Sequence, residues 1–81
     1  MIEDPKMVSI AALLAVPANA KQLAIHQATE KPHIDRYARL SAAHAPAIWI
    51  GADLFIFDGF HRVAAAIARG ETEILAAVIR E

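Results

Sequence analysis

Three short apolar runs in the second half of the chain place the strongest limits on its fold. They cover residues 47–50, 54–57 and 74–79, and runs of this length between turn residues are typical of buried strands. Gly51-Ala52-Asp53 is expected to turn the first run into the second, with the glycine available for a positive φ. Residues 61–69 are expected to form a helix that ends at Gly70 in a left-handed cap. The pattern predicts an α/β (α+β) fold, a short mixed sheet with helices packed against it.

The first half is predicted to begin with a strand at residues 6–9. The hydroxyl of Ser9 can then cap a helical turn over residues 10–16, which Pro17 would end. Residues 19–30 permit a second helix with Asn19 as its cap, followed by a loop from Ala28 to Lys31.

Residues 32–43 are predicted to form a helix that opens on a proline. Ile34, Tyr37, Ala38 and Ser41 recur at helical spacing and would face the core. Asp35 and Arg39 stand four residues apart, a spacing that favours an ion pair on the outer face.

The apolar runs also suggest how the strands pack. Because residues 47–50 and 54–57 are almost unbroken in apolar content, both strands are expected to be buried on both faces. Trp49, Phe55 and Phe57 would then belong to the core. Residues 54–79 form a strand–helix–strand unit, which favours parallel pairing of its two strands through a right-handed crossover.

Length and composition bound the function. The chain of 81 residues is sufficient for one domain, 1–81, with a core over about 7–80. It has no cysteine, no start typical of a signal peptide and no apolar run of membrane-spanning length, so a cytoplasmic protein of bacterial type is expected and no membrane partner. The net charge is −1 and the basic residues are scattered, which argues against DNA binding by this domain alone. The 57% hydrophobic content leaves a homodimer or a protein partner open.

The candidate site is the junction Asp58-Gly59-Phe60-His61-Arg62. A strand stops here and a helix starts with almost no loop, so the first amides of the helix lack partners and carry its partial positive charge. Gly59 lets a ligand approach the backbone, and the guanidinium of Arg62 matches phosphate oxygens. The amides of residues 59–61, including Phe60, are therefore predicted to bind a phosphate or nucleotide with Arg62.

Each side chain of the junction has two interpretations. Asp58 is either a helix cap or a catalytic group, as a Mg²⁺ ligand or general base. His61 either moves a proton, as histidines do near neutral pH, or is held by a backbone carbonyl. Arg62 either contacts phosphate or pairs with a nearby glutamate, Glu71 or Glu73. Phe60 could stack on a base together with Phe55 and Phe57.

The remaining histidines, His26, His33 and His44, show no metal-ligand spacing among themselves and are interpreted as structural or exposed. The expected cofactor is Mg²⁺ together with a nucleotide, with Asp58 as the candidate metal ligand.

The string from Asp58 to Ala66 resembles a signature of the ParB/sulfiredoxin superfamily, in which a glycine, two variable positions and an arginine open a helix. It is most similar to the D-G-H-H-R motif of the free-serine kinase branch, which Asp58, Gly59, His61 and Arg62 match while Phe60 replaces the first histidine. Residues 46–50, 54–57 and 74–79 are similar to strands of the family, and residues 34–40 to its preceding helix. The kinase branch also has an upstream acidic residue, and Glu30 lies in that region.

The resemblance implies a minimal nucleotide- or phosphate-binding domain, with phosphoryl transfer or nucleotide hydrolysis as the reaction if it is an enzyme. Two alternatives remain: a non-catalytic regulatory or protein-interaction domain, and a metal-dependent nuclease, as the family label "ParB-like nuclease domain" suggests. Sulfiredoxin chemistry is excluded because its cysteine is missing. Centromere binding is not expected, since the DNA-binding helical domain of partition proteins does not follow Glu81.

Overall fold

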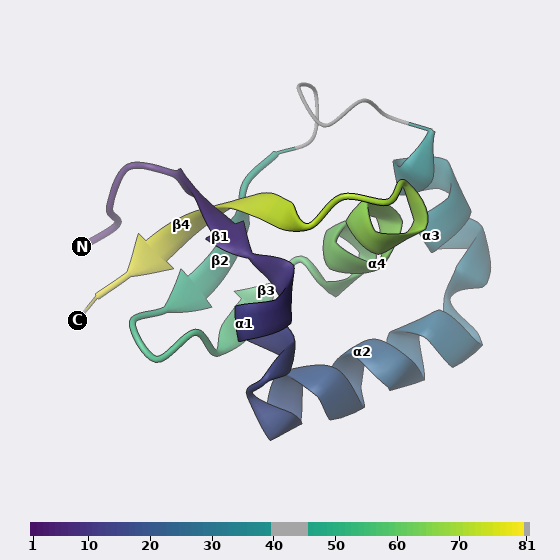
Figure 1. The fold of residues 1–81 in the computed structure, drawn as a ribbon, viewed down its shortest axis with the longest axis horizontal. Coiled ribbons are helices and arrows are strands. Elements are labelled where there is room, and N and C mark those ends of the chain that lie inside the picture. Colours follow the sequence, from purple (N-terminus) through teal and green to yellow (C-terminus); the bar gives the residue numbers. More distant parts are fainter. Residues whose placement is uncertain (40–45, 81) are drawn as a thin grey trace.

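The structure is a computed structural model that describes residues 1–39 and 46–80. Its elements follow in the order β1 (Lys6–Ser9), α1 (Ile10–Leu14), α2 (Pro17–Thr29), α3 (Lys31–Ala38), β2 (Ile48–Gly51), β3 (Ile56–Asp58), α4 (Phe60–Ala68) and β4 (Glu73–Ile79). The four strands form one mixed sheet, so the predicted α+β fold with a small sheet and packed helices is confirmed. In Figure 1 the strands gather at one side and α2, α3 and α4 at the other.

The sheet has the order β1-β4-β2-β3, and one of its pairings differs from expectation. The β2–β3 hairpin is antiparallel, as predicted. However, β4 pairs in parallel with β2 and antiparallel with β1, and it does not pair with β3. The expected parallel pairing within residues 54–79 is therefore wrong. The chain leaves the hairpin through α4 and returns on the far side of β2, which leaves the three-residue strand β3 at the edge.

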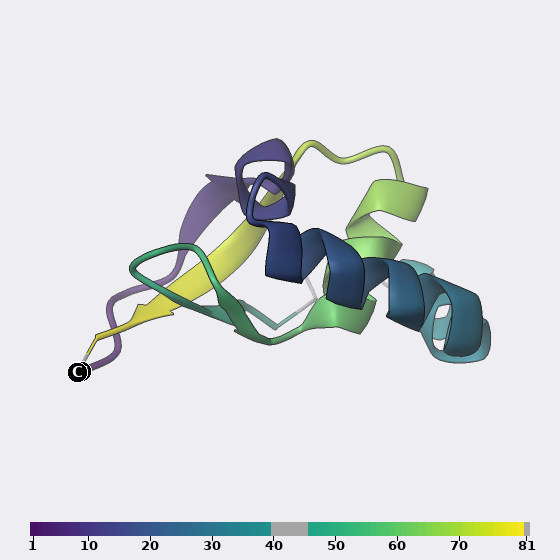
Figure 2. The same cartoon turned by 90° about the horizontal axis from the view of Figure 1, so that it is seen from below.

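The core lies between one face of this sheet and the helices, and Figure 2 shows the helices grouped beside the strands. Buried residues alternate along the strands: Ile48 and Ile50 on β2, Ile56 on β3, and Ile74, Ala76 and Val78 on β4. They pack against buried helix residues such as Leu13, Leu23, Ile34 and Val63. This period of two is that of strands with one covered face.

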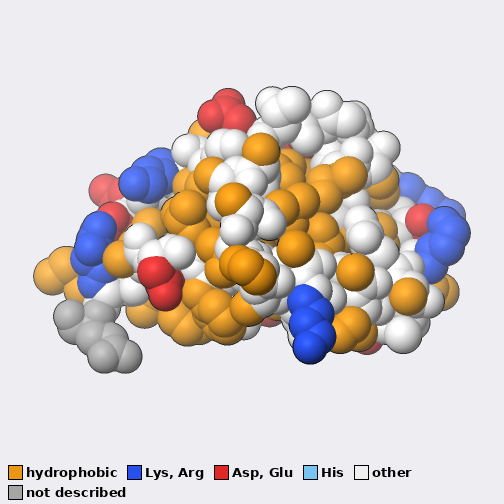
Figure 3. Space-filling model, turned by 60° about the horizontal axis from the view of Figure 1, so that its bottom comes forward, with side chains coloured by type: hydrophobic (Ala, Val, Ile, Leu, Met, Phe, Trp, Pro, Cys, Tyr) orange, Lys and Arg blue, Asp and Glu red, His pale blue; other side chains and the backbone are white. Residues whose placement is uncertain are grey.

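The prediction that β2 and β3 are buried on both faces is wrong. Trp49 is 44% exposed and Phe57 is 58% exposed, and Phe55 is also exposed. These aromatic side chains alternate with Ile50 and Ile56, which are buried, so the strands alternate inward and outward although both kinds of residue are apolar. Apolar side chains cover much of the face seen in Figure 3.

Two local sequence signals correctly predicted where helices begin or end. Ser9 caps α1 by accepting a hydrogen bond from the amide of Ala12 at 3.2 Å, as predicted. Gly70 has a φ of 81° just after α4, as expected of a helix-ending glycine. In contrast, the positive φ in the hairpin belongs to Leu54 rather than to Gly51.

The stretch around residues 17–31 departs most from the prediction. The first helix ends before Pro17, as predicted, but Pro17 itself opens α2, which continues to Thr29. The loop expected from Ala28 to Lys31 is therefore replaced by a tight junction at Glu30. Asn19 is not a cap: it lies inside the helix, fully buried.

α3 follows at Lys31 and ends at Ala38. Asp35 pairs with Lys31 at 3.2 Å, where the sequence suggested Arg39. The predicted extension of this helix over residues 40–43, with Ser41, lies outside the described residues, as does His44.

Candidate functional site

The junction between β3 and α4 is held by a glycine that has no room for a side chain. Gly59 is the N-cap of α4, with a φ of 120°, a conformation that L side chains rarely adopt. A Cβ at this position would stand 2.4 Å from Cγ2 of Ile48 on β2. The glycine is thus explained by the close approach of the helix start to the sheet, before any ligand is considered.

Asp58 does not cap the helix, so that interpretation is wrong. No side chain caps α4, and the Asp58 carboxylate instead forms an ion pair with Arg62, with 3.1 Å between Oδ2 and Nη2. The Asp58 side chain is 75% exposed. The first-turn amides of α4 consequently remain available to an acceptor from outside the helix.

Arg62 is largely buried and already anchored. Only 14% of its side chain is exposed. Its Nη1 donates to the carbonyl oxygen of Ala47 at 3.1 Å and lies 3.4 Å from that of Pro46. The alternative pairing of Arg62 with Glu71 is not what the structure contains, because Glu71 pairs with Arg69. Arg62 therefore connects the first turn of α4 to the segment before β2. Its Nη2 contacts the exposed carboxylate of Asp58.

The three phenylalanines do not form one surface. Phe55 and Phe57 meet edge to face, with 5.5 Å between ring centroids. Phe60 is partly buried against the core, and its ring stacks on His26 at 5.1 Å. A shared base-stacking surface is therefore not what this geometry provides.

His61 lies in a cluster of rings that the sequence did not indicate. Its ring centroid is 4.9 Å from that of His26 on α2 and 5.6 Å from that of His33 on α3. Tyr37 stacks almost parallel to it at 6.2 Å. The Nε2 atom of His61 is 3.7 Å from Oε2 of Glu30 and has no hydrogen-bond partner among the described residues, although it is buried.

The interpretation of His26 and His33 as merely structural or exposed missed this convergence. Neither spacing nor local pattern indicated it, because it depends on how α2 and α3 both pack against α4, the closest helix pairs of the fold. In residues 1–39 and 46–80 no group of three or more histidine, cysteine or acidic side chains is arranged so that it could hold a metal ion.

A cavity of about 330 Å³ adjoins the other side of α4. Arg62 and Ala65 line it from α4 and Arg69 from just after the helix, and Met7 and Leu75 line it from the sheet. Among the junction residues only Arg62 reaches it, so Arg62 connects the helix start with the cavity. A volume of this size lies at the lower end of the range for small-ligand sites.

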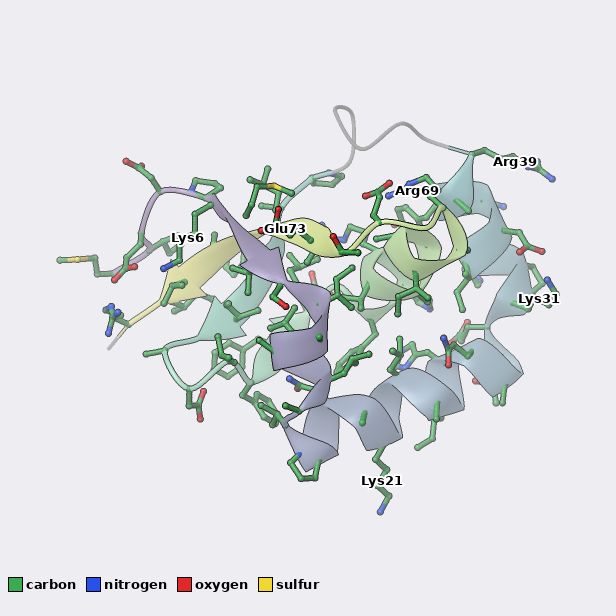
Figure 4. All side chains as sticks on the ribbon, in the orientation of Figure 1. Lys6, Lys21, Lys31, Arg39, Arg69 and Glu73 are labelled. Carbon is green, nitrogen blue, oxygen red and sulfur yellow. The ribbon has the colours of Figure 1, made fainter. Side chains whose placement is uncertain are left out.

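Positive charge is spread over the molecule. Figure 4 shows Lys21 pointing outward from α2, and Lys31 and Arg39 pointing outward from the two ends of α3. Such a distribution offers no continuous basic stripe of the kind that follows a nucleic-acid backbone. No helix within the described residues is both long enough and apolar enough to cross a membrane.

Comparison with known proteins adds no relative: the chain matches no protein-family model, no curated protein and no solved structure. The resemblance to the ParB/sulfiredoxin superfamily stays a prediction that rests on the junction motif and the order of the elements around it.

Proposed function

We propose that this chain is a cytoplasmic domain that binds a nucleotide or another phosphorylated small molecule at the start of α4. The observation that carries the proposal is the placement of Arg62. Its guanidinium is fixed by the carbonyl of Ala47, lines the cavity of about 330 Å³, and meets a single exposed carboxylate, that of Asp58.

The ion pair with Asp58 occupies the place where a phosphate would bind. An exposed aspartate held four residues away on the surface contributes little to stability, because water competes for it. A phosphate carries more charge and would also accept hydrogen bonds from the uncapped amides of Phe60 and His61. Exchange of the carboxylate for a phosphate is thus favourable, and the carbonyl bonds keep the arginine in position for it.

A catalytic role would draw on the neighbouring groups. His61, 3.7 Å from Glu30, would hold or move a proton, and Glu30 fits the upstream acidic residue that the kinase branch of the superfamily leads one to expect. Asp58, released from Arg62, would help to hold Mg²⁺ on the phosphates. The reaction of this arrangement is phosphoryl transfer or nucleotide hydrolysis, where positioning and charge neutralisation do most of the work.

The test is an NMR titration of ¹⁵N-labelled protein with ATP, ADP and CTP, each with and without Mg²⁺. We expect the amide shifts to cluster at residues 59–63. Arg62→Lys keeps the charge but loses the planar fork, and should weaken binding about tenfold or more without unfolding the domain. Arg36→Lys, an exposed arginine on α3, is the matched control. Unchanged spectra at millimolar nucleotide, or equal binding by Arg62→Lys, would refute the proposal.

A second candidate is a non-catalytic protein-interaction domain, and it is favoured by the exposed aromatic side chains of β2 and β3. Trp49 and Phe57 expose apolar area that a partner or a second copy would cover. Sedimentation over a hundredfold range of concentration tests self-association, and a Trp49→Ser/Phe57→Ser variant should abolish it. A monomer at all concentrations leaves only a different protein as partner. We do not propose the nuclease, because no observation favours it.

A further inference from the structure

We propose that the histidine cluster between α2, α3 and α4 binds a divalent transition-metal ion of the zinc type. His33, His61 and Glu30 would be its first three ligands, and His26 the fourth. Each residue comes from a different part of the helical layer: α2, the α2–α3 junction, α3 and α4. Phosphate binding by Arg62 does not depend on this inference, and the ligands do not include Asp58, the candidate for Mg²⁺; a metal ion on His61 and Glu30 would, however, replace the proton transfer proposed for that pair.

The distances around Glu30 are those of ligands that share an ion. Its Oε2 lies 3.7 Å from Nε2 of His61 and 3.8 Å from Nε2 of His33. Both separations exceed a hydrogen bond. Two ligands of a tetrahedral zinc ion, each bound at about 2.0–2.1 Å, stand about 3.4 Å apart. The two distances to Glu30 exceed this value by only a few tenths of an ångström, and the side chains of His33 and His61 must also turn toward each other, because the described residues form no metal-binding group as they stand.

The second observation is the unsatisfied nitrogen of His61. Nε2 is buried and has no hydrogen-bond partner in the part of the chain that the structure describes. Buried polar atoms in folded proteins are almost always paired with protein, water or an ion, so this nitrogen is open to a ligand from outside the chain. A metal ion would take the lone pair that no protein donor uses.

His26 is already oriented as metal-binding histidines commonly are. Its Nδ1 stands 3.0 Å from the carbonyl oxygen of Gln22. Because a carbonyl only accepts, Nδ1 carries the proton, and in the neutral ring the lone pair is on Nε2. A hydrogen bond from the other ring nitrogen to a backbone carbonyl fixes the tautomer and the direction of a histidine that binds a metal. The 4.9 Å between the His26 and His61 ring centroids suits two imidazoles on one ion.

The ligand set selects the kind of metal. Imidazole nitrogens with one carboxylate suit Zn²⁺, Co²⁺, Ni²⁺ and Cu²⁺, whereas Mg²⁺ prefers oxygen ligands and retains its water. The described side chains do not yet surround an ion, so binding should draw α2, α3 and α4 together and raise the thermal stability of the domain.

The test uses the purified full chain, stripped with a chelator and then titrated with ZnCl₂ by calorimetry and with CoCl₂ by visible absorption. We expect one ion per chain, the d–d absorption of tetrahedral Co²⁺, a melting temperature that rises with zinc, and no comparable effect of MgCl₂. His33→Ala removes an exposed side chain and does not threaten folding; it should weaken zinc binding about tenfold or more. His61→Gln and Glu30→Gln should do the same.

Glu73→Gln, the same chemical change at the exposed start of β4, is the control and should leave zinc affinity unchanged. Zinc binding that is equally strong in His33→Ala and His61→Gln would place the ion elsewhere and overturn the proposal, as would the absence of binding at 100-fold molar excess. Nucleotide titrations are run on the stripped protein, so failure of phosphate binding and failure of metal binding are observed separately.

Discussion

Asn19→Ala tests how the first half of the chain is joined to the sheet. The side chain of Asn19 is fully buried within α2. Its Nδ2 donates to the carbonyl oxygens of Leu13 and Leu54, each at 2.8 Å, and its Oδ1 accepts from the amide of Ile56 at 3.0 Å. One amide thus connects the end of α1 and the start of α2 to the edge strand β3.

The expected loss of stability follows from these three hydrogen bonds. Alanine leaves two carbonyls and one amide without their partner in a largely buried place, and each costs about 1–1.5 kcal/mol, or about 3–5 kcal/mol together. A chain of this length has a free energy of unfolding of about 4–12 kcal/mol. The variant should therefore lose about a quarter or more of its stability, which corresponds to a fall in melting temperature of about 12–40 °C.

Urea unfolding followed by circular dichroism and by the fluorescence of Trp49, the only tryptophan, measures this loss. Gln22→Ala is the matched control, because it removes an exposed side-chain amide from the same helix and should change stability by no more than about 0.5 kcal/mol. If Asn19→Ala lies within about 1 kcal/mol of that control, the three hydrogen bonds do not hold α2 to β3 and the packing of the first half is misunderstood.

Three further variants test the junction, the core and the first cap by the same unfolding assay. Gly59→Ala should cost about 2–4 kcal/mol, because the new methyl group meets Ile48 and the backbone is left-handed; an unchanged midpoint would contradict the close approach. Ile56→Ala should cost about 2–5 kcal/mol, since Ile56 is 1% exposed; a loss below about 1 kcal/mol would place it at the surface. Ser9→Ala should cost about 1 kcal/mol through loss of the α1 cap, and no loss would show that the cap is dispensable.

Local patterns were sufficient to predict the elements of the second half. The three strands, the hairpin and the helix before Gly70 depend on neighbouring residues only, and all are present, although β3 starts at Ile56 rather than at Leu54. The exposed faces were not predictable in the same way. Trp49 and Phe57 are as apolar as their buried neighbours, so the sequence does not say which face of the strand the helices cover.

The first half and the histidine cluster depend on tertiary packing. Asparagine is a common helix cap, which is why Asn19 was predicted to be one. Its side-chain amide instead forms hydrogen bonds with backbone groups 35 and 37 residues away. Glu30, His33 and His61 come together only because α2 turns directly into α3 and both helices pack on α4. A charged or polar residue near the end of a predicted helix gives no sign of such a partner.

Two explanations fit the motif at the junction: the packing of the fold and the binding of a ligand. A useful variant must separate these two explanations. Gly59 is required by the contact with Ile48, and Arg62 by its bond to the carbonyl of Ala47, whether or not a ligand binds. Their presence therefore supports the fold of the junction more strongly than it supports a function. Removing either residue confuses the two roles, because the domain loses stability and binding together. Arg62→Lys separates them: the lysine keeps a donor for the carbonyl but cannot also present a planar pair to a phosphate. A stable Arg62→Lys protein that has lost nucleotide binding would show that Arg62 binds the ligand. A stable variant that binds nucleotide normally would leave Arg62 only its role in the fold.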